Sequence, residues 1–238
     1  MRLQDFRGLF HHEEVELISI EHIADDYYVA EFKNPESLSW EPGEHAIFTI
    51  KGRKIKGKKW RAFSIASRHE EGVIRIGTRI GPDPSAYKAV LRDLAPGNRI
   101  DMRGPFGWFK LQDVTSPIVM IAGGIGITPI YGILKELEAS DNRRKVEVIV
   151  SSKGHYLFKE EIDGIAQEDA NITIHYTRSR DEAQAMIKNS SELYGQRGWY
   201  YISGTPSMIR EVTNQLTSSS IPSKRIINDP FKGYRTQS

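Results

Sequence analysis

The pattern of apolar residues changes near residue 114, and this change constrains the fold of the 238-residue chain more than any other feature. Before it, short segments of alternating polar and apolar residues are separated by turn residues, and no long helical pattern precedes Ser85. After it, apolar runs alternate with amphipathic stretches. The first pattern is typical of antiparallel strands, and the second of a parallel sheet with helices on both faces. We therefore predict two domains, residues 1–113 and 114–238.

The first domain is predicted to be a small antiparallel β-barrel, because several short strands follow one another at close spacing. The expected strands are residues 14–23, 27–33, 45–50, 61–67 and 73–80. Residues 85–94 then carry apolar side chains at helical intervals, with Ser85 as the N-cap and Pro96-Gly97 as the stop. One helix is therefore expected to close the barrel.

The second domain is predicted to be a doubly wound parallel α/β sheet, because strands and helices alternate along it. The expected strands are residues 117–122, 146–152, 171–177, 198–203 and 224–229. A glycine turn and a helix follow the first strand, and the later helical patterns lie around residues 158–168, 181–192 and 205–217.

Composition excludes several classes of chemistry. The absence of cysteine excludes disulfides, thiolate metal sites, iron–sulfur clusters and cysteine nucleophiles. The seven histidines lack metal-ligand spacing, so no metal site is predicted. The net charge of +2 is too small for the protein to bind nucleic acid by charge alone. No apolar run approaches the ~20 residues that span a bilayer, and the first segment, MRLQDFRGLF, is too charged for a signal peptide. A cytoplasmic location is expected.

A glycine-rich segment, Ile121-Ala122-Gly123-Gly124-Ile125-Gly126-Ile127-Thr128-Pro129, joins a predicted buried strand to a predicted helix. Glycines at such a turn let the backbone approach a ligand closely, and the free N–H groups at the helix start face an anion such as a dinucleotide pyrophosphate. The alternative is a tight turn without a ligand, because Pro129 takes the place of the last glycine of G-x-G-x-x-G.

A second constellation is Arg61-Ala62-Phe63-Ser64 in a predicted barrel strand, together with Gly104-Pro105-Phe106-Gly107-Trp108-Phe109 before the domain boundary. A flavin dinucleotide needs a cation for its pyrophosphate, a ring to stack on and a hydrogen-bond partner for its reactive edge. The plainer alternatives are that Phe63 is a core residue, Arg61 a solvated strand end and Gly107 a turn residue.

In their order along the chain, these motifs resemble those of the ferredoxin–NADP reductase superfamily, in the branch of bacterial flavin reductases without a fused iron–sulfur domain. The resemblance covers nearly the whole chain. It is carried by Trp40-Glu41-Pro42-Gly43-Glu44-His45, Arg61-Ala62-Phe63-Ser64, Gly104-Pro105-Phe106-Gly107, Gly123-Gly124-Ile125-Gly126-Ile127-Thr128-Pro129, Ser203-Gly204-Thr205-Pro206 and Asp229-Pro230-Phe231-Lys232-Gly233-Tyr234. Each motif is weak alone, but six in this order on matching predicted elements point to the superfamily.

The resemblance implies that the first domain binds FAD. By it, Arg61 holds the flavin pyrophosphate, Phe63 packs on the isoalloxazine and Ser64 hydrogen-bonds near its N5. Ser85 matches a second pyrophosphate contact, although the two prolines in the preceding turn depart from the family pattern. The further flavin-site candidates are Ala62, Thr78 and Arg79.

The resemblance also implies that the second domain binds NADH or NADPH. Ser203 takes the place of a family cysteine beside the hydride-transfer path, and Phe231 is the candidate aromatic cover of the flavin or nicotinamide. The predicted catalytic residues are therefore Ser64, Ser203 and Phe231. The residues expected to receive the dinucleotide are Gly123, Gly124, Gly126, Thr128 and Gly204, with Thr128 nearest the nicotinamide.

Two basic segments bear on specificity. Arg178, Ser179 and Arg180 follow a predicted strand where the superfamily chooses between the two nicotinamides, and they slightly favour NADPH because arginine recognises a 2′-phosphate well. Residues 51–61 contain seven basic side chains that could steer an acidic electron carrier toward the flavin. A solvated loop is the alternative in both cases.

The expected function is that of an FAD-dependent NAD(P)H oxidoreductase that passes hydride to the flavin and electrons onward. Without cysteine the chain holds no iron–sulfur relay, so the acceptor is a separate molecule such as a ferredoxin, a flavodoxin, an oxygenase component or a small oxidant. The alternatives are a free-flavin or ferric reductase and a non-catalytic flavin- or nucleotide-binding subunit of a larger complex. The sequence does not indicate an oligomeric state.

Overall fold

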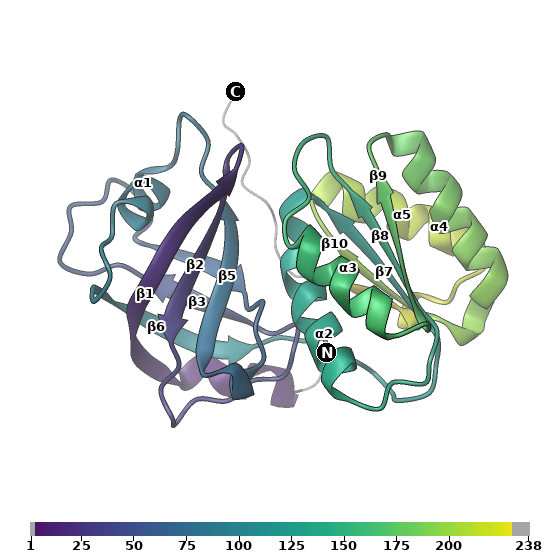
Figure 1. The fold of residues 1–238 in the computed structure, drawn as a ribbon, viewed down its shortest axis with the longest axis horizontal. Helices are drawn as coiled ribbons and strands as arrows, with labels where there is room; N and C mark the ends of the chain where they lie inside the picture. The colour runs from purple at the N-terminus through teal and green to yellow at the C-terminus, as the bar shows by residue number, and fades with distance from the viewer. Residues whose placement is uncertain (1–2, 230–238) are drawn as a thin grey trace.

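The computed structural model describes residues 3–229 and consists of two lobes that lie side by side (Figure 1). The first lobe contains a six-stranded antiparallel sheet in the order β4-β3-β6-β1-β2-β5, and the second a five-stranded parallel sheet in the order β11-β10-β7-β8-β9. The predicted fold class is confirmed. The predicted boundary between residues 113 and 114 falls in the segment that connects β6 with β7.

The strands of the first lobe follow a short 3-10 helix, Leu3–Phe10. They are β1 (His12–Ala24), β2 (Tyr27–Lys33), β3 (His45–Thr49), β4 (Trp60–Ser64), β5 (Val73–Arg79) and β6 (Arg99–Phe106). The two edges of the sheet meet just beyond β4, where the Ala66 amide donates to the Arg75 carbonyl at 2.7 Å. The helix α1 (Ala86–Arg92) packs on the barrel core through Tyr87, whose hydroxyl donates to the Phe48 carbonyl at 3.1 Å.

Strand β6 is absent from the sequence prediction, although it lies in the middle of the sheet between β3 and β1. Its buried Ile100 and Met102 alternate with charged residues, which is the usual signal of a half-buried strand. Strand β6 includes Gly104 and Pro105 and continues to Phe106, which pairs with His45 of β3. Gly107 is the first residue after the strand.

In the second lobe, strands and helices alternate without interruption. They are β7 (Ile118–Gly123), α2 (Ile127–Ala139), β8 (Val146–Ser151), α3 (Lys159–Glu168), β9 (Ile172–Thr177), α4 (Arg180–Tyr194), β10 (Trp199–Ser203), α5 (Pro206–Ser218) and β11 (Ile226–Asn228). Apolar residues of α2 and α3 pack on one face of the sheet, and those of α4 and α5 on the other. None of the helices within residues 3–229 is long and apolar enough to cross a membrane.

The strand order reverses at β7, which lies between β8 and β10. In open parallel sheets the ligand crevice lies at the carboxyl ends of the strands beside such a reversal. The helix α2 starts there and runs along the seam between the lobes (Figure 1). It touches the barrel closely, because a Cβ atom at Gly132 would lie 2.9 Å from the Ile65 carbonyl oxygen.

Candidate active site

Arg61 and Ser85, both predicted to hold the flavin pyrophosphate, are in contact. Arg61 is the second residue of β4, and Ser85 caps α1 by accepting from the Lys88 amide. The Nη2 of Arg61 donates to Ser85 Oγ at 3.1 Å, and the guanidinium carbon lies 5.1 Å from the centre of the Tyr87 ring. Arg61 is only 6% exposed, and this burial lowers its pKa from the ordinary value. A buried guanidinium next to a hydroxyl is a suitable donor set for a diphosphate.

Phe63 and Ser64 lie at the end of β4. Phe63 belongs to the barrel core, where its ring centre lies 5.8 Å from that of Phe48 and 6.3 Å from that of Tyr87. Its packing on the isoalloxazine therefore stays a prediction. Ser64 is buried opposite His45 of β3, and burial lowers the pKa of His45 to about 4.

The other flavin-site candidates differ in exposure. Ala62 is half-buried and, by strand alternation, points away from the face that carries Arg61 and Phe63. Thr78 is buried in β5. Arg79 is exposed, and its Nε donates to the Asp26 carboxylate at 2.8 Å.

The glycine segment between β7 and α2 lies at the strand reversal, against the end of β10. A Cβ atom at Gly126 would lie 2.2 Å from the Ser203 carbonyl oxygen, so no larger residue fits there without a backbone shift. Gly124 has φ +53°, a conformation that favours glycine, and its ideal Cβ lies 3.4 Å from the Tyr27 hydroxyl of the barrel. The nucleotide loop is thus closely packed on both sides.

Gly123 and Gly204 face each other beneath the side chain of Met208. A Cβ atom would lie 2.2 Å from Met208 Sδ if placed on Gly123, and 2.7 Å if placed on Gly204. Met208 is not among the residues predicted from the sequence, because it sits in the first turn of α5 and its apolar side chain gives no local sign of a site.

Thr128 lies where the two lobes are in contact. Its hydroxyl donates to the Ile125 carbonyl at 2.8 Å, and it is buried against β5. A Cβ atom at Gly77 of β5 would lie 2.8 Å from Thr128 Oγ1 and 2.8 Å from Leu157 Cδ2. Strand β5, which ends in the flavin-site candidates Thr78 and Arg79, therefore contacts the predicted nucleotide loop directly.

Ser203 and Asp229 form a buried pair at the end of β10. The Ser203 hydroxyl donates to the Asp229 carboxylate at 2.6 Å, and the Asp229 amide donates to the Ile202 carbonyl at 2.9 Å. Asp229 is absent from the predicted site residues, although it begins one of the motifs that carried the resemblance. The predicted catalytic Phe231 lies outside the described residues.

Arg178, Ser179 and Arg180, which follow β9, each contact Glu182 or Glu211. Ser179 caps α4 by accepting from the Glu182 amide at 3.2 Å, and the Glu182 carboxylate accepts from the Arg178 amide at 3.1 Å. The Nε of Arg180 donates to Glu211 of α5 at 2.5 Å. Arg178 lies over the Tyr156 ring, 5.3 Å from its centre.

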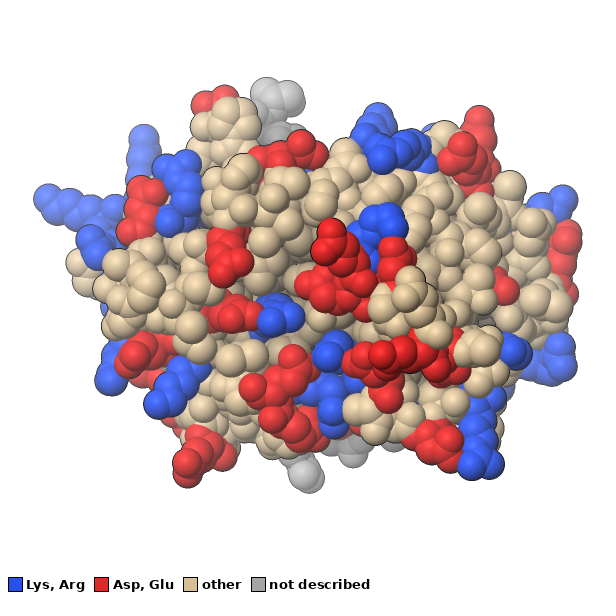
Figure 2. Space-filling model, in the orientation of Figure 1, with Lys and Arg blue, Asp and Glu red and all other residues tan. Residues whose placement is uncertain are grey.

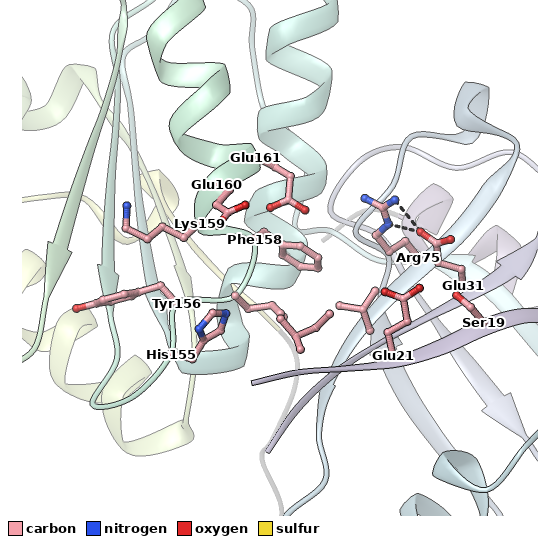
Figure 3. Close-up of a pocket in the computed structure, with 13 residues that line it drawn as sticks. Ser19, Glu21, Glu31, Arg75, His155, Tyr156, Phe158, Lys159, Glu160 and Glu161 are labelled. Carbon is pink, nitrogen blue, oxygen red and sulfur yellow. Dashed lines mark hydrogen bonds and ion pairs between the residues drawn. The ribbon is translucent and has the colours of Figure 1, made fainter. Parts of the chain in front are cut away.

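A cavity of about 440 Å³ opens between the lobes, beside the loop that precedes α3 (Figure 3). None of the predicted site residues that the structure describes lines it. Its apolar wall includes Phe158, and the Arg75–Glu31 ion pair lies on the barrel side. Acidic side chains with basic ones between them gather along this seam (Figure 2), and the cavity rim contributes Glu21, Glu160 and Glu161 to them.

Two family models match separate parts of the chain. The model described as "Oxidoreductase FAD-binding domain" matches residues 14–111, and the model described as "Oxidoreductase NAD-binding domain" matches residues 120–214. Together they cover most of the chain.

Curated relatives include one of the subunits of the Na(+)-translocating NADH-quinone reductase, from several bacteria. The protein of Mannheimia succiniciproducens is 29% identical over 199 residues, which are 73% of this chain and 49% of that protein. The protein of Shewanella denitrificans is 25% identical over 248 residues, and the match covers 91% of this chain and 59% of the Shewanella protein. The chain thus spans about half the length of the relatives it matches.

Solved structures share the fold at low sequence identity. The ferredoxin-NADP+ reductase of Plasmodium falciparum, as its H286L mutant, has a TM-score of 0.78 at 19% identity, covering 93% of this chain and 96% of that one. The Amycolatopsis cytochrome P450 reductase GcoB has a TM-score of 0.77 at 22% identity, and the match covers 93% of this chain and 70% of that one. With one matching domain for FAD and one for the nicotinamide dinucleotide, on a shared two-lobed fold, the chain belongs to the ferredoxin–NADP reductase superfamily and is an NAD(P)H-dependent flavoprotein oxidoreductase.

Proposed function

We propose that the protein takes hydride from NADH and delivers electrons, by way of FAD, to a separate acceptor protein. The contact of Gly77 with Thr128 is the observation that carries this proposal. It joins a strand of the flavin domain to the nucleotide loop, as direct hydride transfer requires, because reacting groups have to meet at ~3–3.5 Å.

The barrel has the donors that FAD needs. Arg61 and Ser85 would hold the pyrophosphate, since they already form one hydrogen-bonded pair, and Ser64 would present its hydroxyl from the end of the same strand. When bound, FAD supplies a two-electron acceptor that can release electrons singly or in pairs. The role of the protein is to position the two cofactors and exclude water between them.

Ser203 and Asp229 would orient the nicotinamide. Because the Ser203 hydroxyl gives its only proton to Asp229, its free lone pairs can only accept hydrogen bonds. The carboxamide N–H of a nicotinamide is a matching donor. The neighbouring Met208 would supply an apolar surface beside Gly123 and Gly204.

We infer that NADH is the preferred donor. A 2′-phosphate would have to displace Glu211 from Arg180 and would lie near the carboxylate of Glu182, and both effects disfavour NADPH. The curated relatives are named as NADH-quinone reductase subunits, which supports the same choice. Two arginines alone would point to NADPH, but the ion pair of Arg180 with Glu211 weighs against it.

The acceptor would be a separate molecule, because the chain has no cysteine for an iron–sulfur relay of its own. A ferredoxin, a flavodoxin or an oxygenase component are the candidates. The curated relatives are named as subunits of a larger enzyme. A further candidate for the acceptor is therefore a partner subunit that stays bound to this protein.

Anaerobic stopped-flow reduction tests the proposal. Protein that stays yellow through gel filtration should bleach rapidly with NADH and more slowly with NADPH. Flavin that washes away on the column would favour the free-flavin reductase. A tightly bound flavin that neither nicotinamide bleaches would favour a non-catalytic subunit, and either result would overturn the proposal.

A further inference from the structure

Tyr27 is the first residue of the barrel strand β2, but its side chain packs into the core of the second lobe. Its ring belongs to the same buried cluster as apolar residues of β7, α2 and β8, and Tyr27 is only 3% exposed. Arg79, its partner on β5, places its guanidinium carbon 5.1 Å from the ring centre. The centre of the His155 ring, in the second lobe, lies 5.9 Å away. The phenol is therefore held between the two lobes.

The Tyr27 hydroxyl lies beside the glycine turn of the second lobe. The ideal Cβ of Gly124, which follows β7, lies 3.4 Å from the hydroxyl oxygen. Ser152, the first residue after the neighbouring strand β8, has its Oγ 3.5 Å from the same oxygen. The sheet order reverses at β7, where the nicotinamide dinucleotide is expected. A barrel residue thus places a hydroxyl at the predicted nucleotide site.

Within residues 3–229, the proton of the Tyr27 hydroxyl has only a distant acceptor. An O–H donor usually lies about 2.5–3.0 Å from its acceptor, whereas Ser152 Oγ is 3.5 Å away. Ser152 donates its own proton to the His155 carbonyl at 2.9 Å, so it can only accept from Tyr27. A buried hydroxyl without a close acceptor is unfavourable. A ligand oxygen at the glycine turn would satisfy it.

We propose that the Tyr27 hydroxyl donates a hydrogen bond to the diphosphate of the bound nicotinamide dinucleotide. The free N–H groups of the glycine turn would bind the same anion. A phenol O–H and a phosphate oxygen form a charge-assisted hydrogen bond, which is stronger than one between neutral groups. This inference rests on the proposed function, because it requires the dinucleotide at the glycine turn. It makes the nucleotide a bridge between the two lobes.

The proposed contact affects binding and leaves the chemical step unchanged. The diphosphate does not react, so its hydrogen bond is equally strong before hydride transfer and in the transition state. Such a contact lowers the Kd and the KM without raising the rate of the chemical step. Tyr27 would differ in this respect from Ser203, which is proposed to orient the reacting ring.

Tyr27→Phe tests the proposal, because the variant keeps the buried ring and removes only the hydroxyl. Calorimetry on the holoprotein should give a Kd for ADP-ribose, which carries the diphosphate but no nicotinamide, about tenfold above that of the wild type. Adenosine, which has no phosphate, should compete with NADH equally well in both proteins. In stopped-flow reduction, the NADH concentration for half-maximal rate should rise about tenfold, while the maximal rate stays the same.

Tyr28→Phe is the matched control. The Tyr28 side chain points to the opposite face of β2, where its ring centre lies 4.8 Å from that of His22. This variant should keep the wild-type Kd for ADP-ribose. If Tyr27→Phe binds ADP-ribose like the wild type, or loses affinity for adenosine to the same extent, Tyr27 only packs between the lobes and the proposal is wrong. If the wild type binds neither ADP-ribose nor NADH, the proposed function fails as well, so the two failures are distinct.

Discussion

Ser203 donates a 2.6 Å hydrogen bond to the carboxylate of Asp229, and both side chains are buried. Ser203 ends β10, and Asp229 directly follows β11, the strand that pairs with β10 in parallel. The pairing of β11 with β10 thus brings Asp229 to the Ser203 hydroxyl, which by the resemblance takes the place of a family cysteine.

Ser203→Ala should slow flavin reduction by NADH about tenfold and leave the FAD content intact, since one hydrogen bond is worth about 1–1.5 kcal/mol. Stopped-flow absorbance measures the rate. Ser203→Cys should retain most of the activity. Ser207→Ala is the control, because Ser207 is exposed in the first turn of α5. An unchanged rate in Ser203→Ala would remove this residue from the site.

Gly126→Ala should raise the KM for NADH and destabilise the protein by about 2 kcal/mol or more, because its Cβ would meet the Ser203 carbonyl oxygen at 2.2 Å. Urea unfolding and steady-state kinetics measure the two effects. Gly164→Ala is the matched control. Gly164 lies inside α3 with nothing within 4 Å of its ideal Cβ, so alanine there should stabilise the helix by about 0.5–1 kcal/mol. Equal behaviour of the two variants would contradict the close packing at Gly126.

His45 should make stability depend on pH in the acid range. Burial lowers its pKa to about 4, so between pH about 6.5 and 4 the unfolded chain binds a proton that the folded protein does not. Stability should therefore fall with falling pH across this window, by up to about 3 kcal/mol. Chemical denaturation at pH 7, 5.5 and 4.5 would measure this loss. His45→Gln should flatten the profile, whereas exposed His12→Gln should not. A wild-type slope that survives in His45→Gln would assign the effect to other groups.

Glu211→Gln should shift the donor preference toward NADPH. The variant weakens the 2.5 Å pair that engages Arg180 and leaves its guanidinium available to a 2′-phosphate. The ratio of kcat/KM for NADPH to that for NADH should rise about tenfold, the scale of one charge-assisted hydrogen bond. Arg180→Gln in the same background should cancel the gain. A ratio that stays at the wild-type value would place the 2′ position of the ribose elsewhere.

Neutralising the basic loop should weaken turnover with a protein acceptor. The exposed cations to replace with glutamine are Arg53, Lys54, Lys56 and Lys59. With an acidic ferredoxin as the probe, the variant should lose most of its dependence on salt, because charge steering raises the encounter rate only at low ionic strength. Reduction of ferricyanide should be unchanged.

The control for this loop removes the same number of exposed cations from the second lobe, at Lys153, Lys188, Arg197 and Lys224. A flat salt profile in the wild type would identify residues 51–61 as a solvated loop.

Local patterns were enough to predict most strands and helices of both domains. The alternation in 27–33 and the helical spacing after Ser85 each report burial on one face, which neighbouring residues reveal by themselves. The same reasoning missed β6, although Ile100 and Met102 alternate with charged residues, because a glycine and a proline interrupt its end. Only pairing with β3 and β1 shows it to be a central strand.

The sequence by itself determined the two-domain order, the glycine turn after β7 and the Arg61 motif, since each depends on a pattern of residues that are close together in the chain. Tertiary structure decided the partners. It joined Arg61 to Ser85, Ser203 to Asp229, and Gly77 to Thr128. These contacts depend on strand register and on how the two lobes pack. They join residues that are far apart in the chain, so no local sequence pattern predicts them.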